Sequence, residues 1–284
     1  MSLRETMAIH GFESNDEYDY QINCLLESQL SAIRCLNIVG DSQRRKTAFA
    51  NALAQAISIE KILYHDFTEK KPPQPDIIMP EITDELGCKE PELESFDKMM
   101  IEASAYSEAE DTVLILDQIQ AADFRDHIRL FEYLKNSVWT IKSDEYFANK
   151  QHLLVFLISE EPLYHSLQKQ CFRVWVSNIS HNLIHYQPED FNLPPESADI
   201  LSALEALFAV LGMVPTKTEY QHLLVDIQQR VYNTDGLKHS IFGWVEGIDR
   251  VALFSQSMDD MMNNALTAIQ DFQCLNQMEL KKLE

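Results

Sequence analysis

The hydrophobic pattern of the first two thirds of the chain alternates short apolar runs with longer segments of helical periodicity. Runs such as VLIL (113–116) and LLVFLI (153–158) are continuously apolar instead of alternating, which is typical of parallel strands buried on both faces. Between the runs, apolar residues recur at spacings of three and four, which predicts amphipathic helices. The predicted strands cover residues 35–40, 61–67, 111–118, 152–159 and 173–179. The predicted helices cover residues 20–34, 46–60, 93–109, 121–137 and 161–171.

The pattern changes after the adjacent prolines Pro194 and Pro195, because the remaining residues show helical periods only. Alternation of strands and helices predicts a parallel sheet that is covered by helices on both faces. We therefore predict the α/β class, with a parallel-sheet domain over residues 21–188 and a smaller all-helical domain over residues 189–284.

Two segments are expected to lie outside these elements. Residues 1–20 are mostly polar and acidic and predict a flexible arm. Residues 68–92 hold five of the ten prolines and predict a loop.

The composition excludes several classes of function. The chain has 284 residues, a formal net charge of −22 and a pI near 4.7. A surface this acidic repels phosphate backbones, so direct nucleic-acid binding by the isolated chain is not expected. No apolar run is long enough for a membrane span, and the first residues lack the apolar core of a secretory signal. The five cysteines are scattered without a metal-binding spacing, which fits a reducing compartment, so we expect a cytoplasmic protein without a membrane partner.

The octapeptide GDSQRRKT (40–47) follows a predicted strand and precedes a predicted helix. A strand, then G-x-x-x-x-G-K-[ST], then a helix is the phosphate cradle of P-loop proteins, in which the lysine reaches the outer phosphates and the hydroxyl binds Mg²⁺. Arg45 stands where the second glycine of this motif belongs. The alternative to a phosphate cradle is a polar turn between a strand and a helix. Within the predicted helical segment 46–60, the helix itself is expected from Ala48 onward. The predicted phosphate-binding residues are Gly40, Asp41, Ser42, Gln43, Arg44, Arg45, Lys46 and Thr47.

The run VLILDQ (113–118) ends a predicted strand with an acidic residue. An aspartate in this place holds Mg²⁺ together with the hydroxyl of the cradle, so Asp117 and Thr47 are the predicted metal ligands. The alternative role for Asp117 is N-cap of the following helix. Gln118 occupies the position of a water-activating glutamate, but its amide cannot take a proton.

In order and spacing these segments resemble an AAA+ ATPase, over about residues 20–250. GDSQRRKT resembles a Walker A motif and VLILDQ a Walker B motif, and LLVFLIS is similar to the sensor-1 strand, which places Ser159 at its polar tip. The segment that follows resembles the clamp-loader helix ending in Ser-Arg-Cys, although here the triplet is Lys169, Gln170 and Cys171. The arginine that reaches into a neighbouring subunit's nucleotide site in this family is therefore missing here, unless Arg173 replaces it.

The helical domain stands where an AAA+ lid would be. NTDGLKHSIFGWVEGI (233–248) resembles the sensor-2 segment, with Lys238 in place of its arginine. Lysine keeps the charge but loses the two-pronged contact with phosphate. The alternative is a solvated lysine on a lid helix.

The resemblance implies binding of ATP or ADP with Mg²⁺ and membership of a larger assembly with other AAA+ or protein subunits. Similarity to clamp loaders implies a role near DNA replication, repair or mobile-element maintenance. Four departures, at Arg45, Gln118, Gln170 and Lys238, predict weak hydrolysis or none.

Two alternatives stay open. An active ATPase would use Glu160, Glu161 or Asp123 to activate water. A protein-interaction scaffold would have an empty site, in which the cations of residues 44–46 would pair with Asp41 or Asp117.

Overall fold

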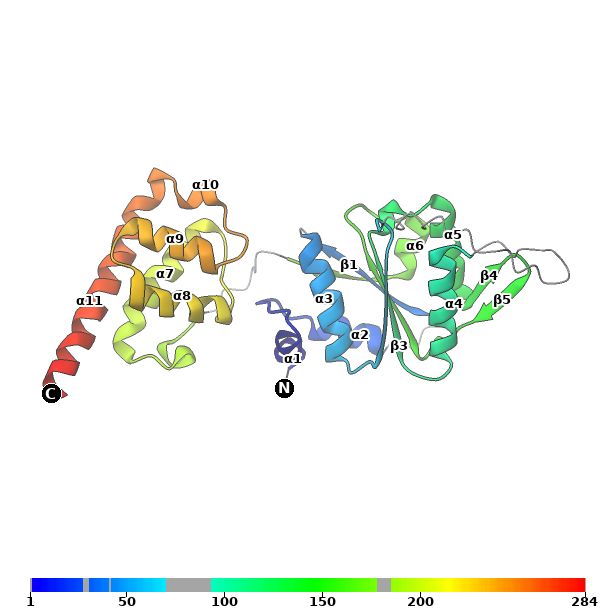
Figure 1. The fold of residues 1–284 in the computed structure, drawn as a ribbon, viewed down its shortest axis with the longest axis horizontal. Coiled ribbons are helices and arrows are strands. Elements are labelled where there is room, and N and C mark those ends of the chain that lie inside the picture. The colour runs from blue at the N-terminus through cyan, green and yellow to red at the C-terminus, as the bar shows by residue number, and fades with distance from the viewer. Residues whose placement is uncertain (1, 28–30, 41, 70–92, 178–184, 284) are drawn as a thin grey trace, which may run out of the picture. The chain divides into compact units, whose positions relative to one another are not determined.

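The computed structural model describes residues 2–27, 31–40, 42–69, 93–177 and 185–283. The chain divides into two compact units (Figure 1). Unit 1 comprises Met1–Phe12 and Tyr18–Val176, and unit 2 comprises Glu13–Glu17 and Ser177–Glu284. The division after Val176 comes earlier than the predicted boundary at residue 188.

Unit 1 contains a five-stranded parallel sheet, as the continuous apolar runs predict. The strand order is β2-β3-β6-β1-β7, so β6 lies between β3 and β1. Leu36 of β1 pairs with Phe156 of β6 on one side and with Phe172 of β7 on the other. The strands are β1 (Arg34–Gly40), β2 (Lys61–Asp66), β3 (Thr112–Asp117), β6 (Leu153–Ile158) and β7 (Phe172–Val176).

Helices cover both faces of this sheet (Figure 1). One face packs Leu36 and Ile38 against Phe49 and Leu53 of α3. The other face packs Leu114 and Val155 against apolar residues of the remaining three helices. On the first face lie α1 (Leu3–Ile9), α2 (Asp19–Leu26) and α3 (Gln43–Ala56), and on the second lie α4 (Ser95–Ser107), α5 (Phe124–Asn136) and α6 (His165–Gln170).

The prediction of a flexible arm over residues 1–20 is wrong. Helix α1 begins with a capping box between Ser2 and Glu5 and buries Met7 in the core of unit 1. The ring of Phe12 lies 5.2 Å from that of Phe49 in an edge-to-face arrangement, and Tyr18 joins the same cluster. A few apolar residues in a mostly polar segment are enough to anchor it, because each aromatic ring buries a large area.

Three local predictions also differ from the structure. Helix α3 begins at Gln43 instead of Ala48, and α2 ends at Leu26, well before residue 34. The antiparallel hairpin of β4 (Val138–Ile141) and β5 (Asp144–Phe147) was not predicted. Its strands have four residues each, too few for an alternating pattern to stand out. Of the predicted loop 68–92, residues 70–92 lie outside the described part of the chain.

The described part of unit 2 is helical, as predicted, and the short segment Glu13–Glu17 belongs to it. The buried Asn15 donates from Nδ2 to the carbonyl oxygens of Val214, at 2.9 Å, and Pro215, at 3.1 Å. The longer helices enclose a core of their own. The helices are α7 (Ala198–Leu211), α8 (Lys217–Arg230), α9 (Thr234–Trp244), α10 (Arg250–Leu253) and α11 (Asp259–Leu283).

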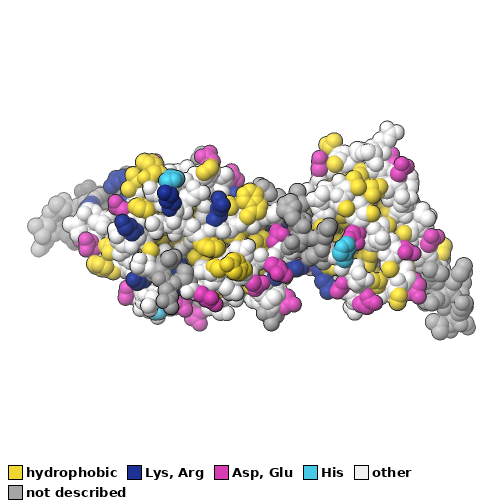
Figure 2. Space-filling view, turned by 180° about the vertical axis from the view of Figure 1, so that it is seen from behind, with side chains coloured by type: hydrophobic (Ala, Val, Ile, Leu, Met, Phe, Trp, Pro, Cys, Tyr) yellow, Lys and Arg dark blue, Asp and Glu magenta, His cyan; other side chains and the backbone are white. Residues whose placement is uncertain are grey.

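Acidic side chains are spread over the surfaces of both units on the face shown in Figure 2. Within the described residues, none of the helices combines the length and the apolar character needed to cross a membrane.

The anchoring of the N-terminal segment makes a testable prediction. Phe12 is 3% exposed, whereas Ile9, at the end of α1, is 68% exposed. Phe12→Ala should lower the free energy of unfolding by about 3 kcal/mol, because it leaves a cavity in an aromatic cluster. Ile9→Ala is the control and should change it by less than about 0.5 kcal/mol. Urea denaturation measures both, and equal small effects would mean that the segment does not contribute to the core.

Candidate functional site

Four of the predicted site residues, Lys46, Thr47, Asp117 and Ser159, lie at the carboxyl edge of the parallel sheet. Lys46 and Thr47 lie in the first turns of α3, which follows β1. Asp117 is the last residue of β3, and Ser159 follows β6 directly. Because β6 lies between β1 and β3, these three strand ends are neighbours. The crevice outside the carboxyl ends of such strands is where open α/β sheets bind ligands.

The side chain of Lys46 is turned into the protein and is 2% exposed. Its Nζ donates to the backbone carbonyl oxygen of Ser159 at 2.8 Å. This hydrogen bond joins the first turn of α3 to the end of β6. A buried ammonium needs such partners, since its desolvation is costly.

Thr47 and Asp117, the two predicted metal ligands, contact each other directly. The Thr47 hydroxyl donates to Oδ2 of Asp117 at 2.6 Å. The same carboxylate oxygen accepts from the phenol of Tyr64 at 2.9 Å, and Oδ1 accepts from the backbone N–H of Gln118 at 2.8 Å. The alternative role of Asp117 as the N-cap of α5 is wrong, because Asp123 occupies that position.

Gln118, beside Asp117, has a strained backbone, and both ends of its side-chain amide form hydrogen bonds. Its backbone is left-handed, with φ of 56°, a conformation that costs a non-glycine residue about 1 kcal/mol or more. Its Nε2 lies 3.3 Å from Oδ1 of Asp117, and its Oε1 accepts from Gln120 at 2.6 Å. The side chain orders the carboxylate and cannot act as a base.

The hydroxyl of Ser159 shapes the turn after β6. It donates to the carbonyl oxygen of Glu161 at 2.6 Å and accepts from the N–H of the same residue at 3.2 Å. Oε1 of Gln120 lies 3.2 Å from it. Gln120 therefore connects Ser159 with Gln118, so these two predicted residues share one network.

Tyr64 and Gln120 belong to the site, but the sequence analysis missed them. Tyr64 lies in a strand whose neighbour cannot be read from local sequence. Gln120 lies in a short 3₁₀ turn, Ile119–Ala121. A glutamine at this place belongs to none of the sequence motifs considered.

The phosphate-cradle octapeptide has a different shape from the predicted loop. Helix α3 begins at Gln43, with Ser42 as N-cap, so residues 43–45 are helical instead of forming an open loop. Arginine at position 45 suits this, because glycine would cost about 1 kcal/mol inside a helix. Gly40 serves strand pairing, since a Cβ there would lie 2.0 Å from the carbonyl oxygen of Val176. Asp41 lies outside the described residues.

Three cations and no acid occupy the first turn of α3. Arg44 is exposed, whereas the guanidinium of Arg45 lies over the ring of Phe12, 5.0 Å from its centroid. Positive side chains at a helix N-terminus oppose the helix dipole. The arrangement therefore favours an anion at this end of α3.

Lys238 lies in unit 2 and is bound within that unit. Its Nζ forms an ion pair with Asp259 at 2.7 Å, and the residue is buried. The alternative of a solvated lysine is therefore wrong. Gln170, at the position that the AAA+ resemblance assigns to a neighbour-sensing arginine, ends α6 in unit 1. Arg173 is exposed on β7.

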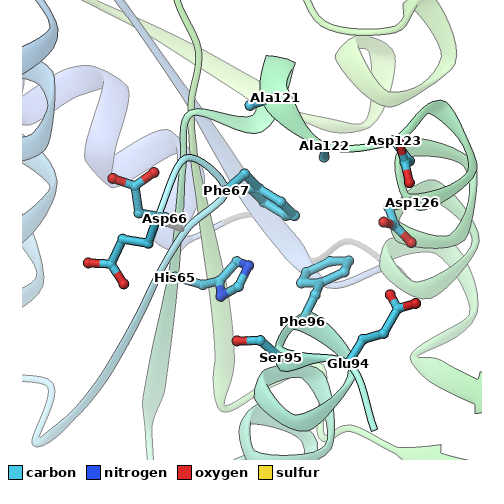
Figure 3. Close-up of a pocket in the computed structure, with 11 residues that line it drawn as sticks. His65, Asp66, Phe67, Glu94, Ser95, Phe96, Ala121, Ala122, Asp123 and Asp126 are labelled. Atoms are coloured by element: carbon cyan, nitrogen blue, oxygen red, sulfur yellow. The ribbon is translucent and has the colours of Figure 1, made fainter. Parts of the chain in front are cut away.

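A separate cleft of about 530 Å³ opens between β2, α4 and the start of α5 (Figure 3). The rings of His65, Phe67 and Phe96 lie together in its middle (Figure 3), and burial lowers the pKa of His65. The carboxylates that line it belong to Asp66, Glu69, Glu94, Asp123 and Asp126. So acidic a cleft repels phosphate, which distinguishes it from the site at Lys46.

No group of three or more His, Cys, Asp or Glu side chains in the described ranges could hold a metal ion by itself.

Comparison with known proteins finds neither a family model that matches this chain nor a similar curated protein.

The hydrogen bond from Tyr64 to Asp117 makes stability depend on pH. Burial and the Asp117 carboxylate raise the pKa of Tyr64 far above its usual value, so the fold favours the protonated phenol. Its contribution is full below about pH 10 and is lost as the pH rises further, because the unfolded tyrosine ionises near pH 10. Tyr64→Phe should cost about 1 kcal/mol of unfolding free energy at pH 7.

Denaturant titrations of wild type and Tyr64→Phe between pH 7 and pH 11 measure this effect. The difference between the two proteins should shrink above about pH 10. Tyr232→Phe, whose hydroxyl bonds only an exposed backbone carbonyl among the contacts described, is the control. A difference independent of pH would contradict a contribution from the phenol proton.

Proposed function

We propose that unit 1 binds the phosphates of an adenine nucleotide, with Mg²⁺, at the carboxyl edge of its sheet, as an AAA+-like nucleotide-binding domain. The observation that carries this proposal is the 2.6 Å contact between Thr47 and Asp117 next to the buried Lys46. A hydroxyl, a carboxylate and a lysine from these three places form the phosphate and metal site of P-loop proteins.

The residues fit both parts of the ligand. Mg²⁺ prefers oxygen ligands and is usually bound by one or two carboxylates with phosphate oxygens, which Asp117 and Thr47 can complement. The phosphates would meet the N-terminal turn of α3 with the exposed Arg44, and Lys46 would have to leave the Ser159 carbonyl to reach them. Because the chain as a whole is strongly acidic, an anion can bind only where cationic side chains such as these are close together.

Efficient hydrolysis is not part of the proposal. Bound Mg²⁺ and a base are needed to activate water for attack on a phosphate. Gln118 supplies no base, and its amide is held by Asp117 and Gln120. Of the alternative bases, Asp123 lines the acidic cleft, and Glu160 and Glu161 are exposed.

The role of the bound nucleotide would be to bias the conformation of the chain within a larger assembly of AAA+ or other protein subunits, since a ligand shifts an equilibrium by its differential affinity. The resemblance to clamp loaders supports a place in DNA replication, repair or mobile-element maintenance. Because the net charge is −22, any contact with nucleic acid would come mainly from partner subunits.

A nucleotide-free interaction scaffold is the second candidate, and two observations favour it. Helix α3 begins three residues before Lys46, which shortens the loop that would surround the phosphates. Lys46 and Asp117 also have hydrogen-bond partners within the chain. This candidate predicts that nucleotide does not bind.

Calorimetric titration of ATP and ADP, with and without Mg²⁺, separates the two candidates. Wild type should bind, and Lys46→Met and Asp117→Asn should each weaken binding about tenfold or more, equivalent to ~1.4 kcal/mol. The Asp117 variant should lose mainly the dependence on Mg²⁺. Lys135→Ala removes the same charge from an exposed position on α5 and should bind as wild type does.

Phosphate release from ATP should stay at the background rate in the same preparations. Wild-type protein that is folded yet binds no nucleotide at millimolar concentration would overturn the proposal and favour the scaffold. Steady turnover that is lost in Glu160→Gln, Glu161→Gln or Asp123→Asn would instead support an active ATPase.

A further inference from the structure

Two cysteines that are far apart in the sequence have their sulfur atoms in contact. The Sγ atoms of Cys35 and Cys171 are 3.1 Å apart, although 136 residues separate them. Cys35 lies in β1, and Cys171 directly precedes β7. Because Leu36 pairs with Phe172, the two cysteines occupy the preceding positions of neighbouring parallel strands.

This placement matches the requirements of a disulfide. Neighbouring strands are about 4.8 Å apart, within the range of about 4.4–6.8 Å that disulfides span between Cα atoms. A disulfide bond is about 2.0 Å long, so the sulfurs need to approach by about 1 Å. A movement of this size is within the reach of side-chain rotation.

The two thiols differ in access. Cys35 is 1% exposed and belongs to the core on the α4–α6 face of the sheet, whereas Cys171 is partly exposed. Burial, together with the neighbouring Cys171, raises the pKa of the Cys35 thiol. The thiolate is the reactive form of cysteine, so an oxidant in solution meets Cys171 first and Cys35 reacts second.

We infer that Cys35 and Cys171 form a modification site, a dithiol that closes to a disulfide on reaction with hydrogen peroxide. In the first step the Cys171 thiolate attacks the peroxide, an S–O bond forms, the O–O bond breaks, and one water leaves after protonation. Cys171 is then a sulfenic acid, oxidised by two electrons. In the second step the Cys35 sulfur attacks Cys171, the S–O bond breaks, and the Cys35 proton leaves with the hydroxide as a second water.

The disulfide would join β1 to the edge strand β7 at their amino ends. The proposed phosphate site lies at the opposite, carboxyl end of β1, after Gly40. This inference therefore does not depend on the proposed function. In a reducing compartment the dithiol is the resting form, and the disulfide reports exposure to oxidant.

Peptide mapping of the full chain tests the inference. Reduced protein is treated with hydrogen peroxide, the remaining thiols are alkylated, and the protein is digested with trypsin. Cleavage after Arg34, Arg44, Lys169 and Arg173 releases Cys35 in the peptide 35–44 and Cys171 in the peptide 170–173. The expected product is these two peptides joined, lighter by two hydrogen atoms than their sum and lost on reduction.

Two sets of variants make the result specific. A chain with Cys24, Cys88 and Cys274 all replaced by serine should form the linked peptide as the wild type does. Cys171→Ser, at the partly exposed position, should abolish it, and the Cys35→Ser chain should instead accumulate Cys171 as the sulfenic acid, detected by a dimedone adduct. Recovery of both peptides as separate alkylated species after peroxide treatment, or linkage of either cysteine to Cys24 or Cys274 instead, would overturn the inference.

Discussion

The position of β6 between β1 and β3 is the constraint on which the rest of the site depends. Parallel pairing on both sides of β6 brings the ends of three strands to one edge, and the segments that leave these ends carry Lys46, Asp117 and Ser159. The hydrogen bond from the Lys46 ammonium to the Ser159 carbonyl then fixes α3 against β6. A buried lysine without such a partner would cost several kcal/mol, so the position of α3 and the geometry of the edge are coupled.

Much of this architecture could be predicted from local sequence, and the failures share a physical cause. Continuous apolar runs such as Val113–Leu116 mark buried parallel strands because both faces are covered, and all five strands of the sheet were found. Strand order is decided by contacts between distant residues, so periodicity gives no information on it. The order of the N-terminal segment could not be predicted either, because it also depends on a contact between distant residues. Phe12, in a mostly polar segment, packs against Phe49.

The site was predictable where a motif fixes spacing and unpredictable where the fold brings unrelated segments together. Thr47 and Asp117 are in contact, and Lys46 reaches the strand end at Ser159. Tyr64 could not be foreseen, because its contact with Asp117 follows from the pairing of β2 with β3. The contact between Cys35 and Cys171 follows likewise from the pairing of β1 with β7, and spacing rules consider only cysteines that are close in sequence.

The residues at positions 45, 118 and 238, which differ from the motifs of AAA+ proteins, each have contacts that explain them. Arg45 continues α3 toward its N-terminus and stacks on Phe12, and Lys238 is neutralised by Asp259. At position 118 the amide nitrogen lies beside the buried carboxylate of Asp117. A glutamate there would set two carboxylates side by side in a site of low polarity, which raises one pKa and costs stability. Because the amide of Gln118 is also held by Gln120, restoring a base would require changes at several positions. These contacts support the proposal that the site binds a ligand without activating water.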